Sequence, residues 1–476
     1  MRTPASAAAP ARPGPNPAKQ STALHRTLAV TVIGSVMAVL DMTIVNVAMR
    51  RLSQSFGASL ETIQWTATAY TLALAAVIPT AAWAMARLGA KRTYLTALVL
   101  FTLGSLLAAC AWDAGSLIAF RAVQGLGGGL LQPVGMTMVM GAADRSRLGR
   151  AMAVGGLPIL IGPVAGPVLG GWLVDAASWH WIFLVNVPVG ALALTLGLRL
   201  LPPDAQKAGT GRSAARLDLP GLLMLSPGLA LLLYGLARGG ERGDFTAPGA
   251  LLPTLAGAAL AAAFVRRALT ASAPLLDLRL LRDRTFAAGA GTLALFTCGY
   301  FGAMLLGPLY WQQERGLSAT ATGLLGAPTG LVAGTAMQIA ARRIDKVAPR
   351  RLIPAGIVLA ALGMALLAWQ TGVPGVAPWR MVASAMVMGI GTAMVLMPTM
   401  TTASRGLPAD RLAAASTALS INSQLGASVG TAVLSVVLGS AGMAPAGFRT
   451  AYTVAAALLA LAALPALRLP GRRDPG

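Results

Sequence analysis

Fourteen mainly apolar stretches of about 20 residues follow one another along this chain of 476 residues. Each stretch is long enough to cross the hydrocarbon core of a bilayer, about 30 Å thick, as a single helix. With 56% hydrophobic and 11% charged residues, the composition excludes a soluble enzyme. We predict an all-α polytopic membrane protein with about fourteen spanning helices. The stretches lie at 28–48, 62–86, 92–111, 115–140, 149–173, 180–200, 218–237, 247–268, 286–312, 320–341, 351–369, 379–402, 411–440 and 446–467.

The basic residues predict how the chain is oriented in the membrane. In a soluble protein the formal net charge of +22 would suggest binding to nucleic acid. Here, however, Lys and Arg gather in every second loop between the apolar stretches. The basic side holds both termini, and by the positive-inside rule it is cytoplasmic. We therefore predict a multi-pass protein of the cytoplasmic membrane whose partner is the lipid bilayer, not nucleic acid. The other side holds Arg50, Arg51, Arg238, Arg242, Arg315, Arg380 and Arg449.

A short internal sequence repeat predicts the domain organisation. The connection after the second stretch reads Arg87-Leu-Gly89-Ala-Lys91-Arg92, and a similar string at 346–351 follows the tenth stretch. Two such turns favour a duplicated six-helix bundle, although any cytoplasmic loop tends to be basic. The predicted parts are a disordered cytoplasmic tail at 1–27, an N-terminal bundle at 28–200, two inserted helices with linkers at 201–285, a C-terminal bundle at 286–468 and a cytoplasmic tail at 469–476.

Asp41 and Arg121 are the two charged side chains that lie deep inside the apolar stretches. An ionised group there costs a few kcal/mol, so we expect both to have a task. At 1.5 Å per residue each lies roughly 10 Å beneath the outer boundary, which predicts a direct or water-bridged ion pair. Burial favours the protonated acid and a guanidinium favours the ionised one. Asp41 would therefore couple proton flow to alternating access with Arg121 tuning it, unless the pair only fixes helix packing.

Four strings lie in order on the first, fourth, fifth and sixth stretches. They read Leu40-Asp41-Met-Thr43-Ile-Val-Asn46-Val-Ala48, Arg121-Ala-Val-Gln124-Gly125-Leu-Gly127-Gly128, Gly162-Pro163-Val-Ala-Gly166-Pro167-Val-Leu-Gly170-Gly171 and Trp179-His180-Trp181-Ile182-Phe183-Leu-Val-Asn186-Val-Pro188-Val-Gly190. Together they resemble the major facilitator superfamily, in its fourteen-helix drug:proton antiporter branch. The resemblance covers nearly the whole chain and implies two six-helix bundles with two helices inserted between them.

The loop after the second stretch departs from the pattern of that family. Ala82 stands where the family has a glycine, and Ala86 stands where it has an acid that helps to latch the two halves on the cytoplasmic side. Asp345 fills the matching position in the second half. The resemblance thus implies a latch that is weakened or differently made. Its residues would be Arg87, Gly89, Lys91, Arg92 and Asp345.

Three glycines of the 162–171 string recur every four residues and so line one face of a helix. Such a face lets another helix approach closely, and prolines in the same turns loosen the backbone hydrogen bonding. Ordinary packing is one interpretation. The family match favours a tight, bendable contact between the two halves. The conformational residues of these strings are Gly125, Gly162, Pro163, Gly166, Pro167, Gly170 and Gly171.

Uncharged polar and aromatic side chains at membrane depth are candidates for substrate contacts. Amides at this depth either line a cavity or join helices, and the sequence leaves both interpretations open. Aromatic rings and thioethers offer adaptable apolar surfaces. The candidate substrate-binding residues are Asp41, Asn46, Gln124, Tyr300, Gln338 and Asn422.

These features predict a secondary transporter that exports hydrophobic or amphipathic compounds, such as antibiotics or dyes, in exchange for protons. A specific metabolite or siderophore transporter of the same fold is the alternative. A membrane-embedded enzyme or receptor is disfavoured, since the sequence shows no metal-ligand cluster and no Gly-x-Ser-x-Gly string. No phosphate-binding loop is present, so we expect no cofactor and take the proton gradient as the energy source. An adaptor protein is neither indicated nor excluded.

Overall fold

The computed structural model describes residues 17–143, 148–204, 218–271, 274–276, 278–304, 306–343, 347–408, 411–441 and 444–471. Every regular element in these ranges is helical. The first half contains α1 (Pro17–Phe56), α2 (Leu60–Val77), η1 (Ile78–Thr80), α3 (Ala81–Leu88), α4 (Ala90–Ala109), α5 (Ala114–Ala142), α6 (Leu148–Ala176), α7 (Trp181–Leu184) and α8 (Asn186–Leu200).

The rest of the chain continues as helices. Between the halves lie α9 (Leu219–Arg242), α10 (Pro248–Thr270) and η2 (Leu278–Arg282). The second half contains α11 (Arg284–Ala303), α12 (Leu306–Leu309), η3 (Tyr310–Glu314), α13 (Ala319–Arg343), α14 (Pro349–Thr371), α15 (Pro378–Arg405), α16 (Leu412–Ala441), α17 (Pro445–Leu461) and α18 (Ala463–Ala466).

The predicted apolar stretches fall on these helices one after another. Among the described residues, 11 helical segments are long and apolar enough to cross a membrane. Some spans are broken where a proline lacks the N–H that a continuous helix needs. Pro79 lies in η1, between α2 and α3, and Pro188 follows the break between α7 and α8. The all-α, polytopic class predicted from the sequence is confirmed, whereas the domain boundaries stay a prediction.

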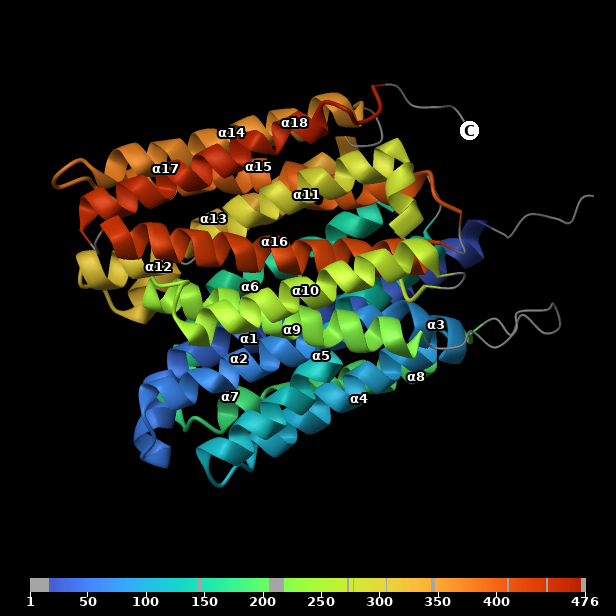
Figure 1. The fold of residues 1–476 in the computed structure, drawn as a ribbon, viewed down its shortest axis with the longest axis horizontal. Helices are drawn as coiled ribbons and strands as arrows, with labels where there is room; N and C mark the ends of the chain where they lie inside the picture. The colour runs from blue at the N-terminus through green and yellow to red at the C-terminus, as the bar shows by residue number, and fades with distance from the viewer. Residues whose placement is uncertain are drawn as a thin grey trace, which may run out of the picture.

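The two halves lie side by side, with α1–α8 in blue to green and α11–α18 in yellow to red (Figure 1). The start of α1 and the end of α18 lie at the same end of the bundle, together with α3. We call this the basic end, because α3 contains Arg87 and is followed there by Lys91 and Arg92 at the start of α4. Direct contact between the halves runs mainly through α6 with α13 and through α5 with α16.

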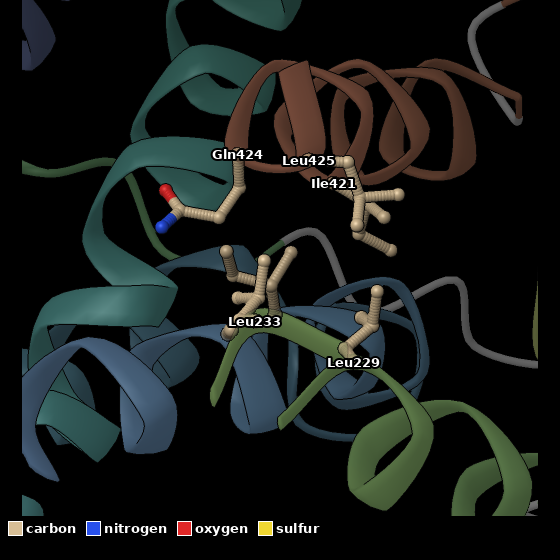
Figure 2. A pocket seen from close by; sticks show the side chains of 7 residues that line it. Leu229, Leu233, Ile421, Gln424 and Leu425 are labelled. Carbon is tan, nitrogen blue, oxygen red and sulfur yellow. The ribbon is translucent and has the colours of Figure 1, made fainter. Parts of the chain in front are cut away.

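The inserted helices pack as a hairpin against the junction of the halves. α9 contacts α10 along its length, and it also contacts α2 of the first half and α16 of the second. The rings of Trp65 and Tyr234 stack with their centroids 5.5 Å apart, which attaches α9 to α2. Where the three helices meet, a small pocket is present (Figure 2). Its lining is apolar except for Gln424, and consists of Ala75, Ile78, Leu229, Leu233, Ile421, Gln424 and Leu425.

The halves are packed together at the basic end. Met136, Val139 and Met140 near the end of α5 belong to the same buried cluster as Phe286 and other side chains of the second half. The hydroxyls of Thr137 on α5 and Ser416 on α16 lie 2.5 Å apart. At the opposite end, the buried cluster around α7 contains described residues of the first half alone. The structure is therefore closed at its basic end.

The glycine stripe of α6 corrects one prediction. Cβ atoms added to Gly162 or Gly166 would overlap Val39 or Thr43, which belong to α1 of the same half. At Gly170 an added Cβ would lie 3.1 Å from Ile44. The stripe therefore brings α6 close to α1 and does not face the other half, so the predicted contact between halves was wrong here. Helical spacing identifies a small-residue face but not the helix that it faces. Gly171 is buried on the same helix, while the side chains of Pro163 and Pro167 lie outside the described residues.

Candidate functional site

Among the described side chains of the first half, the acid and the base that are deeply buried meet directly. Nη1 of Arg121 on α5 lies 2.5 Å from Oδ2 of Asp41 on α1. The side chain of Asp41 is 0% exposed and that of Arg121 is 1% exposed. The ion pair predicted from their common depth is confirmed as a direct contact. Removing one partner would leave an uncompensated charge that is shielded from solvent, so the two residues act as a unit.

Two amides complete the set of donors around the carboxylate. Nε2 of Gln124 donates to Oδ1 of Asp41 at 2.7 Å, and Nδ2 of Asn186 donates to the same oxygen at 2.9 Å. Oε1 of Gln124 accepts from Nη1 of Arg121 at 2.7 Å. Gln124 thus bridges acid and base because its position, three residues after Arg121, places it on the same face of α5. Both carboxylate oxygens therefore accept hydrogen bonds.

Glycines bring the neighbouring helices close enough to enclose Arg121. A Cβ at Gly125 would overlap the carbonyl of Tyr70, so α5 and α2 pack at short range. The Tyr70 ring consequently lies under the guanidinium, whose Cζ is 4.3 Å from the ring centroid. Nε of Arg121 donates to the carbonyl of Thr66 at 3.3 Å. Along the opposite side of α5, a Cβ at Gly104 of α4 would lie 2.6 Å from the backbone of Gln124.

A second row of hydrogen bonds leads away from Asp41. Nδ2 of Asn186 also bonds Oγ of Ser105 at 3.0 Å, and that hydroxyl donates to the carbonyl of Phe183 at 2.9 Å. Phe183 lies in α7 and Asn186 begins α8, so both flank the break that precedes Pro188. The row therefore connects the carboxylate to the junction of two helices.

The start of α5 is fixed by its own cap. The Ser116 N–H donates to Oδ1 of Asp113 at 2.6 Å, and the Ser116 hydroxyl in turn bonds the Asp113 N–H at 3.1 Å. This reciprocal pair ends the loop at a defined residue, two turns before Arg121. The bond from the Ser116 N–H lowers the pKa of the exposed Asp113 carboxyl below its ordinary value.

The comparison with known proteins identifies the family. The sequence profile of the Major Facilitator Superfamily matches residues 31–431. The chain belongs to this superfamily. It is thus a multi-pass membrane transporter and not an enzyme, and the resemblance inferred from its four strings is confirmed.

Relatives and solved structures agree with that assignment. The chain is 42% identical to the multidrug resistance protein B homolog of Mycobacterium tuberculosis over 425 residues, which cover 89% of this chain and 77% of the relative. It is 32% identical to the putative multidrug resistance protein MdtD of Serratia proteamaculans over 471 residues, covering 95% of each. The crystal structure of the human organic anion transporter MFSD10 superposes with a TM-score of 0.66, covering 93% of this chain and 99% of that one at 16% identity. The structural likeness concerns the fold alone.

Within this superfamily fold, the predicted substrate-binding residues do not form one cluster. Asp41 and Gln124 lie in the ion-pair network, while the side chain of Asn46 lies outside the described residues. Nδ2 of Asn422 donates to the carbonyl of Ala290 at 2.9 Å and so joins α16 to α11. Tyr300 is buried in the second half, where its ring contacts those of Phe296 and Phe301. Nε2 of Gln338 on α13 is buried and has no hydrogen-bond partner in the described part of the chain.

The loop residues of the predicted latch hold elements of the first half together. Gly89, with φ of +91°, is the N-cap of α4. The Lys91 and Arg92 N–H groups donate to the two carboxylate oxygens of Asp204 at 2.8 and 3.2 Å. Nζ of Lys91 donates to the carbonyls of Leu198 and Leu201. Asp204, just after α8, thus supplies an acid next to this loop. At position 86 of the same loop, alanine stands where the family has an acid. Arg87 is exposed, and Asp345 lies outside the described residues.

Sequence reasoning missed Asn186, Ser105, Tyr70 and Asp204 as parts of these sites. Asn186 had a signal, because it lies in the quoted string at 179–190. Asp204 was included in the linker after α8, and nothing in its local sequence distinguishes it from other loop acids. The contacts of Ser105 and Tyr70 depend on which helices become neighbours, which the sequence of either helix does not specify.

Proposed function

We propose that this transporter exports hydrophobic or amphipathic compounds, such as antibiotics or dyes, across the cytoplasmic membrane in exchange for protons, by alternating access. One observation carries the proposal: Asp41 has no exposed surface and is held by a guanidinium and two amides. The relatives named as multidrug resistance proteins support the choice of substrate class.

Asp41 is the proton carrier in this proposal. In the arrangement described here, three N–H groups donate to its carboxylate. A movement that draws Arg121 away from Asp41 would remove the strongest of these interactions and favour proton uptake. Proton binding and helix movement would then be linked reciprocally, as coupling requires.

The closure at the basic end supports an alternating-access cycle. With this end in the cytoplasm, as the positive-inside rule indicates, the described arrangement corresponds to a state that is shut toward the cytoplasm. Export would require the halves to part at that end, separating Thr137 from Ser416 and opening the buried cluster around Met136. Both termini would lie in the cytoplasm.

The substrate would bind between the two halves. Asp41 and Gln124 would contribute from the first half, and Gln338 from the second. The unpaired Nε2 of Gln338 supports this placement, because a buried donor without a partner is costly and a ligand oxygen would satisfy it. The proton gradient would supply the energy, so no cofactor is needed.

The test is uptake of a hydrophobic monovalent dye into everted membrane vesicles that carry a pH gradient. Asp41→Asn keeps the size of the side chain and removes its charge, so we expect it to abolish uptake driven by the gradient. Asp244→Asn is the matched control, because Asp244 is an exposed acid in the loop between α9 and α10. Uptake by Asp41→Asn at the rate of Asp244→Asn, still abolished by an ionophore that collapses the gradient, would exclude Asp41 as the carrier.

A further inference from the structure

We propose that Asn186 reports the protonation state of Asp41 to the junction of α7 and α8, with Ser105 as the intermediate. The proposal rests on the proposed function, since it assigns a positioning residue to the same proton carrier. Asn186 is 4% exposed, and its Nδ2 touches both Asp41 and Ser105.

Protonation of Oδ1 of Asp41 adds an O–H donor to an oxygen that otherwise only accepts hydrogen bonds, and this donor needs an acceptor. No bond between heavy atoms forms or breaks, and Arg121 keeps its charge. The new O–H then faces Nε2 of Gln124 and Nδ2 of Asn186, which are donors themselves. One of the two amides must invert so that its oxygen accepts the proton of the acid.

Gln124 is not free to invert. Its Oε1 accepts from Nη1 of Arg121 at 2.7 Å, so inversion would place its NH₂ group against the guanidinium. Asn186 has no such constraint, because its other partner is the hydroxyl of Ser105, which can donate as well as accept. The geometry therefore selects Asn186 as the amide that turns.

Inversion of Asn186 has a consequence at Ser105. The amide oxygen then occupies the place of Nδ2 and accepts from both the acid and the hydroxyl. The Ser105 hydroxyl, which donated to the carbonyl of Phe183 at 2.9 Å, turns away from it. That carbonyl loses its side-chain donor in α7, next to the break before Pro188. Protonation of Asp41 on α1 thereby changes the hydrogen bonding at the outer end of the sixth span.

Other charges near the network do not compete for this role. Among the described side chains, the titratable groups that contact it are Arg121 from α5 and Tyr70 from α2, whose ring faces the guanidinium. From α4, α7 and α8 the hydrogen-bonding contributions are those of Ser105, Phe183 and Asn186, none of which titrates. From α6, the hydrogen bond described near Asp41 on α1 joins the Thr43 hydroxyl to the carbonyl of Gly162, and neither group titrates.

The first test is the pH profile of dye export by Asn186→Ala. Loss of a hydrogen bond to the ionised acid favours its protonation, so the pH midpoint should rise by about one to two units. Gln370→Ala is the matched control, because Nε2 of Gln370 is a buried amide donor to the Ser384 hydroxyl in the second half. We expect this control to change the rate without moving the midpoint. Equal midpoints for parent, Asn186→Ala and Gln370→Ala would overturn the proposal.

The second test observes the junction directly in purified protein. The fluorescence of Trp181, taken as the difference between the parent and Trp181→Phe, should change on acidification. The change should be lost in Ser105→Ala, which keeps Asn186 but lacks the hydroxyl, and should persist in Gln370→Ala. Persistence of the full change in Ser105→Ala would overturn the relay. Because this measurement needs no transport, it also applies to variants that fold but do not export.

The two proposals fail differently. If Asp41→Asn still exports at full rate on a pH gradient, the proposed function fails. If Asp41→Asn abolishes export while Asn186→Ala leaves the pH midpoint in place, the assignment of Asn186 alone fails. Size-exclusion profiles of each variant identify those that do not fold, for which Asn186→Leu, similar in size but without a donor, takes the place of Asn186→Ala.

Discussion

Replacing Arg121 by leucine tests whether the buried pair is an energetic unit. The change removes donors to Asp41, Gln124 and the carbonyl of Thr66, as well as the contact with the Tyr70 ring. It leaves Asp41 as a charge at 0% exposure, with two amide donors remaining. Removing one partner of a buried pair costs about 3–5 kcal/mol, and we expect a loss of this size in the free energy of unfolding.

A double-mutant cycle separates this effect from lost packing. Asp41→Asn removes the charge that Arg121→Leu leaves behind, so the double variant should be less destabilised than the sum of the two single variants, by about 2–3 kcal/mol. The pair of Asp218 and Arg267 at the base of the inserted hairpin is the control. Its distance is 2.7 Å, and Asp218 is 3% exposed. Because Arg267 is 36% exposed and its charge is screened by solvent, the coupling should stay below about 1 kcal/mol.

The assay is chemical unfolding in detergent, followed by tryptophan fluorescence. Additivity of Asp41→Asn and Arg121→Leu within about 0.5 kcal/mol would refute the view that they stabilise each other. Transport should not return in the double variant, since the carrier is absent. Recovery of stability without recovery of transport would distinguish the structural from the coupling contribution.

Four further results are expected. Gly166→Ala should lower the free energy of unfolding by about 1–3 kcal/mol, because the added Cβ would overlap α1. Gly155→Ala on the same helix is the control: its Cβ would meet nothing within 4 Å, so it should be near neutral in the same unfolding assay. Thr137→Val with Ser416→Ala removes a hydrogen bond of about 0.5–1.5 kcal/mol between the halves, so cysteines placed at the basic end should react faster with a membrane-impermeant thiol reagent. Asp204→Ala should cost about 0.5–2 kcal/mol in thermal unfolding, since it deprives the start of α4 of its cap. Monovalent or neutral compounds should be exported better than divalent cations in vesicle assays, because one acid lies at depth; efficient export of dications would contradict this.

Much of the fold followed from apolar length and charge position. The pairing of Asp41 with Arg121 followed from the fixed rise of a helix, which gives depth without knowledge of neighbours. The place of Gln124 followed from its spacing of three residues from Arg121. These are properties of single helices, which a sequence specifies directly.

The remainder depended on which helices touch. The stripe at Gly162 and Gly166 was visible, but its partner α1 was not, because any helix with suitable side chains fits a smooth face. Asn186 is the first residue of α8, which begins after the helical break between α7 and α8. This position lets its side chain contact Asp41. Asp204 reaches α4 through a backbone path after α8 that no periodic pattern encodes.

The position of α9 between α2 and α16 has a mechanical consequence. Leu229 and Leu233 of α9 meet Ile421 and Leu425 of α16 across the small pocket without a directed bond (Figure 2). Such hydrocarbon surfaces can slide over one another with little change in energy, since no hydrogen bond has to be exchanged for another. The inserted hairpin thus contacts the second half through an apolar surface that permits sliding. At another contact between the halves, α6 and α13 meet directly.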